Sequence, residues 1–275
     1  MTPVAFLRVD TVGLLPDVRA GLVALLRDLD GPEWDRGTAC PGWRVADVAR
    51  HLLGVELGNV SRRRDGQRVG PPPGADLPTW LDGFNEDWVR AARLLSPRVL
   101  ADLLDVAGGW FEAHVAGLDL DAIGPPVWWV GPEPAPVWLD VAREYTERWV
   151  HQQQIRDAAG RPGLDGARHT GPVIATFVHA LPRSLDGAVA ATGTTVDLVV
   201  TGEGGGTWHA VRADRRRGWD LEPGPSDAPA CTLTGTVRDA WRMYAGYPGV
   251  ALAATGDPVL AGRALAGRAV IAATP

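Results

Sequence analysis

The chain has 275 residues, of which 45% are hydrophobic and 22% charged, and its formal net charge is −6. This composition is that of an ordinary globular protein long enough for two domains, and it excludes a disordered chain. The acidic balance argues against broad nucleic-acid binding, and the absence of lysine excludes Schiff-base chemistry and a P-loop lysine.

No apolar run approaches the roughly 20 residues of a membrane helix, so we expect no membrane partner. The first residues lack the basic and apolar regions of a signal peptide, and Cys40 and Cys231 are expected to be free thiols in a reducing compartment. We therefore expect a cytoplasmic protein that is a monomer or a homodimer.

The first half of the chain is predicted to be helical because apolar residues recur at intervals of three and four. Thr79 followed by Asp82 resembles a capping box, and Ser96 before Pro97 resembles an N-cap with proline at the first helical position. Helices are predicted over residues 11–30, 45–63, 79–95, 97–118 and 137–159.

The pattern changes after a glycine-rich linker near residues 160–171, where a helix predicted over 172–191 leads into short extended segments. Strands are predicted at 196–200, 207–211, 218–221 and 230–233, and two closing helices at 236–246 and 257–267. We predict an α+β protein with a helical bundle at about 1–165 and a smaller α+β domain at about 170–275.

Two separated segments offer two histidines and a carboxylate. Glu147 and His151 are four residues apart and would share one face of a helix, and His51 needs only a neighbouring helix to join them. Three such ligands leave one coordination position open, as in catalytic zinc sites. Gly54 and Gly58, on the face of His51, would leave room for a ligand. The alternative is a surface helix pair beside a hydrogen-bonded core histidine.

Other residues near these segments have weaker claims. Glu144 lies two turns, about 10 Å, from His151, so Glu147 is the better ligand. We predict a catalytic role for Glu144, as a general base or a partner of a ligand, with a solvated helix residue as the alternative. Cys40 could approach the metal, although packing at a helix start is the alternative.

Two tryptophans, Trp128 and Trp129, precede the predicted helix at 137–159 in a proline-rich segment. They could form a wall of a cofactor pocket above the metal. The alternative is that their rings pack between the two domains.

The run Cys40-Pro-Gly-Trp43, with His51-Leu-Leu-Gly54 and Glu147-Arg-Trp-Val-His151 further on, resembles the mycothiol-dependent maleylpyruvate isomerase family of the DinB-like metalloenzyme superfamily. The resemblance covers most of the chain. It implies a four-helix bundle that holds zinc through His51, Glu147 and His151, and a C-terminal domain resembling sterol carrier proteins. It also implies mycothiol as the thiol cosubstrate.

The chain departs from the family pattern in having Gln153 or Gln154 where the family has an aspartate. Arg242 is our candidate for the family's C-terminal arginine, which would contact an anionic group of the substrate, with Arg238 and Arg263 as alternatives. We do not carry over the identity of the substrate.

These observations predict a metal-dependent isomerase or S-transferase in which the metal favours the thiolate form of a low-molecular-weight thiol, which attacks a small electrophile. Two alternatives remain open. The same metal could activate water for hydrolysis, or the chain could be a non-catalytic small-molecule binding protein.

Overall fold

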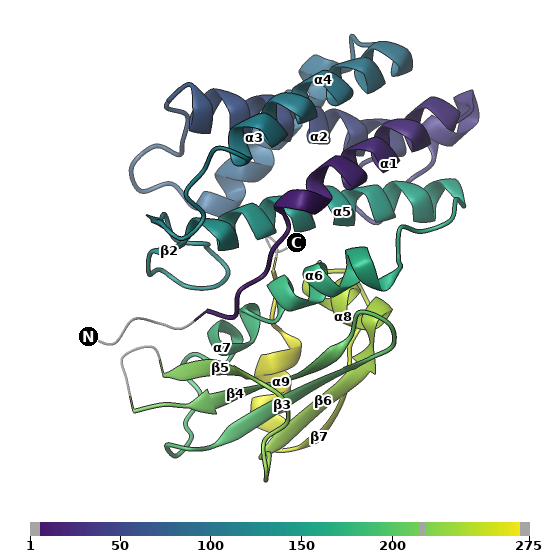
Figure 1. Cartoon of the computed structure of the whole chain (residues 1–275). Helices are drawn as coiled ribbons and strands as arrows, with labels where there is room; N and C mark the ends of the chain where they lie inside the picture. Colours follow the sequence, from purple (N-terminus) through teal and green to yellow (C-terminus); the bar gives the residue numbers. More distant parts are fainter. Residues whose placement is uncertain (1–5, 215–217, 270–275) are drawn as a thin grey trace. The chain divides into compact units, whose positions relative to one another are not determined.

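The computed structural model describes residues 6–214 and 218–269, and in it helices precede a β-sheet along the chain (Figure 1). The described residues divide into two compact units. The helical unit contains Thr11–Leu120 and Glu144–Leu164, and the sheet unit contains residues 6–10, Asp121–Arg143 and residues 165–269. The α+β prediction is therefore confirmed, with helices in the N-terminal part and the sheet in the C-terminal part.

Long α-helices dominate the helical unit, as predicted. They are α1 (Leu15–Asp28), α2 (Val45–Asn59), α3 (Leu77–Ala92), α4 (Pro97–Val115) and α5 (Val137–Ala159). Short turns of helix flank them: η1 (Val12–Leu14), η2 (Gly31–Asp35) and η3 (Val60–Arg64), the last a π-helix that continues α2. The first seven residues of α5, Val137–Arg143, belong to the sheet unit.

The predicted N-cap of α4 is correct, whereas that of α3 is wrong. Ser96 accepts a hydrogen bond from the backbone N–H of Val99, which satisfies a donor at the start of α4. In α3 the cap is Asp76, whose carboxylate accepts bonds from both the backbone and the hydroxyl of Thr79. A carboxylate competes well for these positions because it also interacts favourably with the helix dipole.

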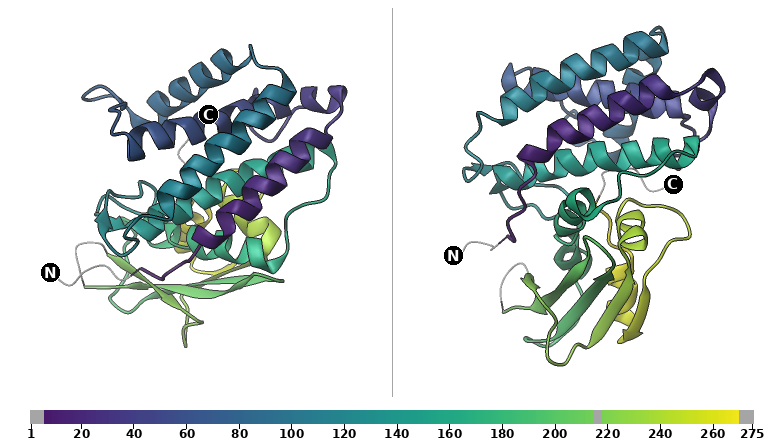
Figure 2. Two further views of the ribbon diagram at one scale, coloured as in Figure 1. Left: turned by 45° about the horizontal axis from the view of Figure 1, so that its top comes forward. Right: turned by 45° about the vertical axis from the view of Figure 1, so that its right-hand side comes forward.

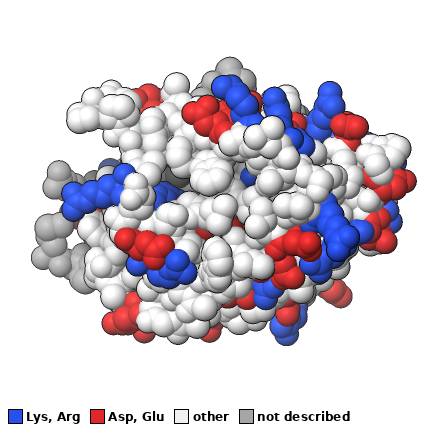
Figure 3. Space-filling view, turned by 90° about the horizontal axis from the view of Figure 1, so that it is seen from above, with Lys and Arg blue, Asp and Glu red and all other residues white. Residues whose placement is uncertain are grey.

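The core of the helical unit lies between α1, α2 and α4, with α3 packed on α2. It is built from apolar side chains at helical spacing, including Leu22, Leu26, Val48, Leu52 and Leu104. Ion pairs such as Arg27–Asp102 connect α1 to α4 at the surface, where each contributes little to stability. Charged side chains of both signs lie close together on the face shown in Figure 3.

The sheet unit is built on a five-stranded sheet in the order β5-β4-β3-β6-β7. Its strands are β3 (Thr195–Thr201), β4 (Gly206–Arg212), β5 (Trp219–Pro223), β6 (Cys231–Thr236) and β7 (Ala253–Gly256). β3 pairs in parallel with β6, and the other pairs are antiparallel. Val196, Leu198 and Val200 alternate along β3 and are buried, so this central strand supplies one apolar face.

The helices of the sheet unit are α6 (Ala167–Phe177), α7 (Ala180–Ser184), α8 (Val237–Tyr244) and α9 (Pro258–Leu265), and Figure 2 shows them beside the sheet. The single helix predicted at 172–191 is wrong. Pro172 lies inside α6 instead of at its start, and the chain breaks between α6 and α7 near His179. At the start of α8, predicted near residue 236, Thr236 and Asp239 form a capping box.

Two segments of the predicted first domain, residues 6–10 and Asp121–Arg143, fall in the sheet unit. The second segment contains the short strands β1 (Ile123–Gly124) and β2 (Ala135–Pro136). Its tryptophans explain the grouping, because Trp129 contacts Phe177 and Trp138 contacts His179 through edge-to-face rings. Among the described residues, no helix is both long enough and apolar enough to cross a membrane.

Candidate metal centre

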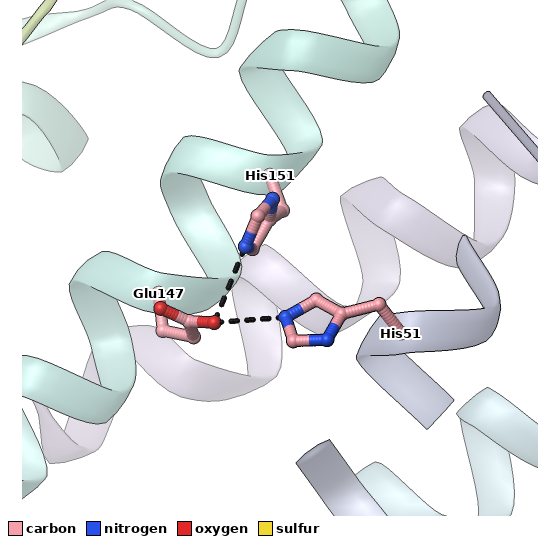
Figure 4. A group of neighbouring side chains, drawn as sticks. All are labelled: His51, Glu147 and His151. Carbon is pink, nitrogen blue, oxygen red and sulfur yellow. Dashed lines mark hydrogen bonds and ion pairs between the residues drawn. The ribbon is translucent and has the colours of Figure 1, made fainter. Parts of the chain in front are cut away.

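His51 meets the Glu147–His151 pair, 96 and 100 residues further along the chain, inside the helical unit. His51 projects from α2, and Glu147 and His151 project from the same face of α5 toward it (Figure 4). Oε1 of Glu147 lies 3.0 Å from Nε2 of His51 and 3.2 Å from Nε2 of His151. The two helices are antiparallel, since residues later in α2 contact residues earlier in α5.

The arrangement of donor atoms fits a metal ion. One ligand atom of each residue lies within 4.8 Å of the other two, and of the described residues these form the one such group of three. Two imidazole nitrogens and a carboxylate oxygen are the ligand set of many catalytic zinc sites. Their close approach requires positive charge between them, supplied by a proton or a cation.

A hydrogen bond fixes the orientation of His151. Its Nδ1–H donates to Oε1 of Gln154 at 2.7 Å, which leaves Nε2 to face Glu147. Partners of this kind commonly set the tautomer of metal-binding histidines. Cys40 donates to the same amide oxygen at 3.0 Å. The Cys40 thiol therefore lies on the Nδ1 side of His151, away from Nε2, which faces Glu147. This position favours packing at the helix start, one of the two roles considered for Cys40, over ligation of the metal.

The charges of the three residues are strongly coupled. Burial lowers the pKa of His51, so this ring favours its neutral form. Burial alone would lower the pKa of His151, but the adjacent Glu147 carboxylate raises it well above its usual value. Burial alone would raise the pKa of Glu147, but His151 and His51 hold it well below its usual range. The metal-free centre is thus an ion pair of Glu147 and protonated His151 beside a neutral His51.

The three side chains of the site differ in exposure, and the ring of Trp43 covers one side of His51. The side chains of His51 and His151 are 5% and 14% exposed, whereas that of Glu147 is 29% exposed. The ring of Trp43 lies 5.0 Å from that of His51, measured between centroids. Glu147 is therefore partly accessible to solvent, whereas His51 is shielded from it.

The two glycines beside His51 have different surroundings. A Cβ on Gly54 would lie 2.7 Å from Cγ of Trp88, so the missing side chain makes room for this α3 tryptophan and not for a ligand. The expectation for Gly54 is wrong for that reason. A Cβ on Gly58 would meet nothing within 4 Å among the described residues.

Glu144 is occupied by a buried network of charges. It is 1% exposed, and its carboxylate accepts hydrogen bonds from Asn59, Arg63 and Arg148. The alternative that it is a solvated helix residue is therefore wrong. Three donors already satisfy the carboxylate, so this geometry favours a structural partner over a general base, and the predicted catalytic role stays a prediction.

Sequence reasoning missed the other members of this network. Arg148 and Glu56 are 4% and 6% exposed, and they face each other from α5 and α2. The signal available in the sequence was the spacing of Glu144 and Arg148, four apart on one helix. Nothing local indicates that the pair is buried.

The remaining predicted site residues lie in the sheet unit. Trp129 is buried against Phe177, and Trp128 is 46% exposed. Arg242 of α8 lies over the rings of Trp241 and Tyr247. Their predicted roles with a cofactor and an anionic substrate stay predictions.

Comparison with known proteins finds a family match to part of the chain and a fold shared over most of it. A family model described as the mycothiol maleylpyruvate isomerase N-terminal domain matches residues 15–156. A crystal structure of the mycothiol-dependent maleylpyruvate isomerase shares the fold, with a TM-score of 0.54 and 12% identity over 89% of this chain and 91% of that one. A histidine-to-alanine mutant of that isomerase matches with a TM-score of 0.52, at the same identity and coverage. No curated protein matches the sequence significantly.

Proposed function

This chain belongs to the mycothiol maleylpyruvate isomerase family, and from that premise we propose that it is a metal-dependent enzyme acting with a low-molecular-weight thiol. The observation that carries the proposal is the convergence of His51, Glu147 and His151 on one point of the helical unit. Mycothiol is the thiol that the family name supports. The identity of the metal is proposed as zinc because the donors are two nitrogens and one oxygen.

The residues of the chain prepare the site in three ways. Glu147 balances part of the charge of a divalent ion, and Gln154 keeps the lone pair of His151 Nε2 directed at it. Trp43 shields His51 from water. When bound, the ion supplies Lewis acidity that favours the thiolate form of a thiol close to it.

The proposed reaction is addition and elimination at an electrophilic double bond. The thiolate sulfur forms a bond to one alkene carbon, and the π electrons move to the adjacent activating group. Rotation about the resulting single bond and loss of the same thiolate restore the double bond in the other geometry. The thiol is regenerated, so isomerisation consumes none. Retention of the thiol would instead give a conjugate, the S-transferase outcome.

We further propose finer features of the fold and the setting. Helices α1, α2, α4 and α5 correspond to the four-helix bundle of DinB-like proteins, and the sheet unit to the domain resembling sterol carrier proteins. Arg242 binds an anionic group of the substrate, and Arg242→Leu would raise KM for an anionic substrate more than it lowers kcat. A reducing, cytoplasmic setting suits a reaction that needs a free thiol.

The test is elemental analysis combined with a thiol-dependent assay. Wild-type protein should contain about one equivalent of zinc per chain, and His51→Ala and His151→Ala should contain much less. His114→Ala, which removes a histidine from α4 outside the cluster, is the matched control and should keep the metal. Metal content equal to wild type in both cluster variants would show that the ligand assignment is wrong.

The assay separates the thiol enzyme from a hydrolase. Maleylpyruvate is the first substrate to try, because the relatives are named for it. Turnover should require both mycothiol and the metal, with the thiol recovered afterwards. Turnover of electrophilic substrates without any thiol would favour hydrolysis and contradict the proposal.

A further inference from the structure

A network of mostly buried charged and polar side chains joins α2 and its π-helical extension to α5. Glu56, Asn59, Glu144 and Arg148 are each no more than 6% exposed, and Arg63 completes the set. Its two carboxylates face the guanidinium groups of Arg63 and Arg148. The network and the candidate metal centre are both built from α2 and α5, and Arg148 follows Glu147 on α5.

Arg148 is the centre of this network. Its Nε and Nη2 donate to the two oxygens of Glu56 at 2.7 and 2.8 Å, a bidentate pairing. Its Nη1 donates at 2.8 Å to both the carboxylate and the backbone carbonyl of Glu144. The guanidinium carbon lies 4.0 Å from the centre of the Phe111 ring of α4. Three helices therefore hold this one side chain in place.

The second carboxylate is satisfied from α2 and η3. Oε2 of Glu144 accepts from Asn59 at 2.7 Å, and Oε1 accepts from Arg63 at 3.1 Å. The amide oxygen of Asn59 in turn accepts from Arg62 and Arg63. The two bonds to Glu144 depend on one longitudinal alignment of α2 with α5, whereas those of Asn59 with Arg62 and Arg63 are local.

We infer that the Arg148–Glu56 pair sets the register of α2 against α5 and thereby brings His51 to Glu147. The functional meaning of this inference rests on the proposed metal site. The alignment of α2 with α5 can nevertheless be measured in the metal-free protein. Glu147 and His151 share a helix and would stay together in any register. His51 alone depends on the alignment, which makes Arg148 and Glu56 positioning residues for this ligand.

The physical reason lies in the difference between apolar and ionic contacts. Apolar side chains such as Leu52 and Tyr145 are buried on these helices, but hydrophobic contact is not directional and tolerates sliding. A slip of one helical turn moves α2 by about 5.4 Å along α5. Such a slip would leave buried charges unpaired, and unpaired buried charges are strongly disfavoured. The pair therefore specifies alignment, whereas its net contribution to stability is small.

The test replaces the pair by apolar side chains in the double variant Glu56→Leu/Arg148→Leu, which leaves Glu144 bonded to Asn59 and Arg63. Urea denaturation should show a folded protein of stability similar to wild type. In metal-free wild type, the rings of His51 and His151 lie 4.7 Å apart between centroids and should give a nuclear Overhauser effect. Because the bonds of Glu144 to Asn59 and Arg63 remain and hold part of the alignment, the double variant should weaken this signal clearly without abolishing it. Its zinc affinity should fall roughly 10- to 100-fold.

A matched control removes a similar pair that does not join α2 to α5. Arg161 donates from Nε and Nη2 to the two oxygens of Glu33 at 3.1 and 2.8 Å, within the same helical unit. The variant Glu33→Leu/Arg161→Leu should keep the Overhauser effect and the zinc affinity. Adding His51→Ala to Glu56→Leu/Arg148→Leu should cause a smaller loss of zinc affinity than His51→Ala causes in the wild type, because the double variant already displaces His51 from the site in part of the molecules.

Two results would overturn the inference. One is a folded Glu56→Leu/Arg148→Leu protein whose Overhauser effect is as strong as in the wild type. The other is a Glu33→Leu/Arg161→Leu control that loses the Overhauser effect to the same extent as Glu56→Leu/Arg148→Leu. If Glu56→Leu/Arg148→Leu fails to fold, Glu56→Gln decides: a weakened signal supports the inference and a wild-type signal overturns it. A wild type that binds no zinc would refute the proposed function alone, because the Overhauser comparison uses metal-free protein.

Discussion

Nε2 of His51 lies 3.0 Å from Oε1 of Glu147, although the two residues are 96 positions apart in the sequence. His151 approaches the same oxygen at 3.2 Å. A single carboxylate oxygen thus serves two imidazoles, and the charge state of the three groups is shared. This relationship determines how the site should respond to pH and to substitution.

Zinc binding should release protons at neutral pH. The pKa of His151 is raised well above its usual value, so the ring is protonated in the metal-free protein at pH 7 and must lose that proton to bind a metal. The apparent affinity of the protein for zinc should therefore rise with pH until the pH passes the pKa of His151. Calorimetry in buffers of different ionisation enthalpy measures the number of protons released.

Glu147→Gln is the control for this proton release. Without the carboxylate, the main cause of the raised pKa is gone, and fewer protons should be released per zinc bound. Binding enthalpies that do not depend on the buffer in the wild type would contradict the assigned charge state.

Gln154→Leu should weaken zinc binding roughly 10- to 100-fold, the usual effect of removing a hydrogen-bond partner of a ligand. The substitution removes the acceptor that holds His151 Nδ1–H and leaves the ligands unchanged. Competition with a chelating dye measures the affinity.

Gln154→Glu keeps an acceptor at this position and should lose less affinity than Gln154→Leu. Cys40→Ser tests the thiol that shares the amide oxygen, and we expect a change of less than about threefold, because His151 keeps its own bond. Equal affinities for Gln154→Leu and wild type would show that the hydrogen bond does not position His151.

Gly54→Ala should destabilise the helical unit by about 1–3 kcal/mol, the usual cost of overpacking. The new methyl group would meet Trp88 at 2.7 Å, and a large ring cannot retreat as a flexible chain can. Gly58→Ala, on the same helix in open space, should instead stabilise the protein by up to about 1 kcal/mol. Urea denaturation measures both, and similar effects at the two positions would contradict the packing assigned to Trp88.

Tyr244→Phe should stabilise the sheet unit by about 1 kcal/mol and most strongly at alkaline pH. The Tyr244 hydroxyl is buried with no hydrogen-bond partner among the described residues, and such a group is costly to bury. Burial raises the pKa of this phenol above its ordinary value near 10.

The sign of the pH effect follows from linkage. The pKa of Tyr244 is higher in the folded than in the unfolded protein. Its ionisation therefore leaves the free energy of unfolding unchanged below about pH 10 and lowers it as the pH rises further. The wild type should therefore lose more stability than Tyr244→Phe between pH 9 and about pH 11. Parallel stability curves for the two proteins would contradict the assigned environment.

The sequence predicted most helices and strands because their signals are local. The predicted bounds of α5, about 137–159, agree with the structure, because Pro136 precedes the helix and Gly160 and Pro162 follow it. The errors arose where a local signal was ambiguous. The helix predicted at 172–191 starts too late, because α6 begins at Ala167 and continues through Pro172. The edge strand β7 was missed because its small residues carry no alternating pattern.

For the site, the sequence by itself determined that Glu147 and His151 share one face of a helix, because residues four apart on a helix must do so. Only the tertiary structure decided that His51 joins them and that Gly54 accommodates Trp88. It also decided that Glu144 is bound to buried arginines. These contacts depend on how α2, α3 and α5 pack, and packing is set by the whole core rather than by any local run of residues.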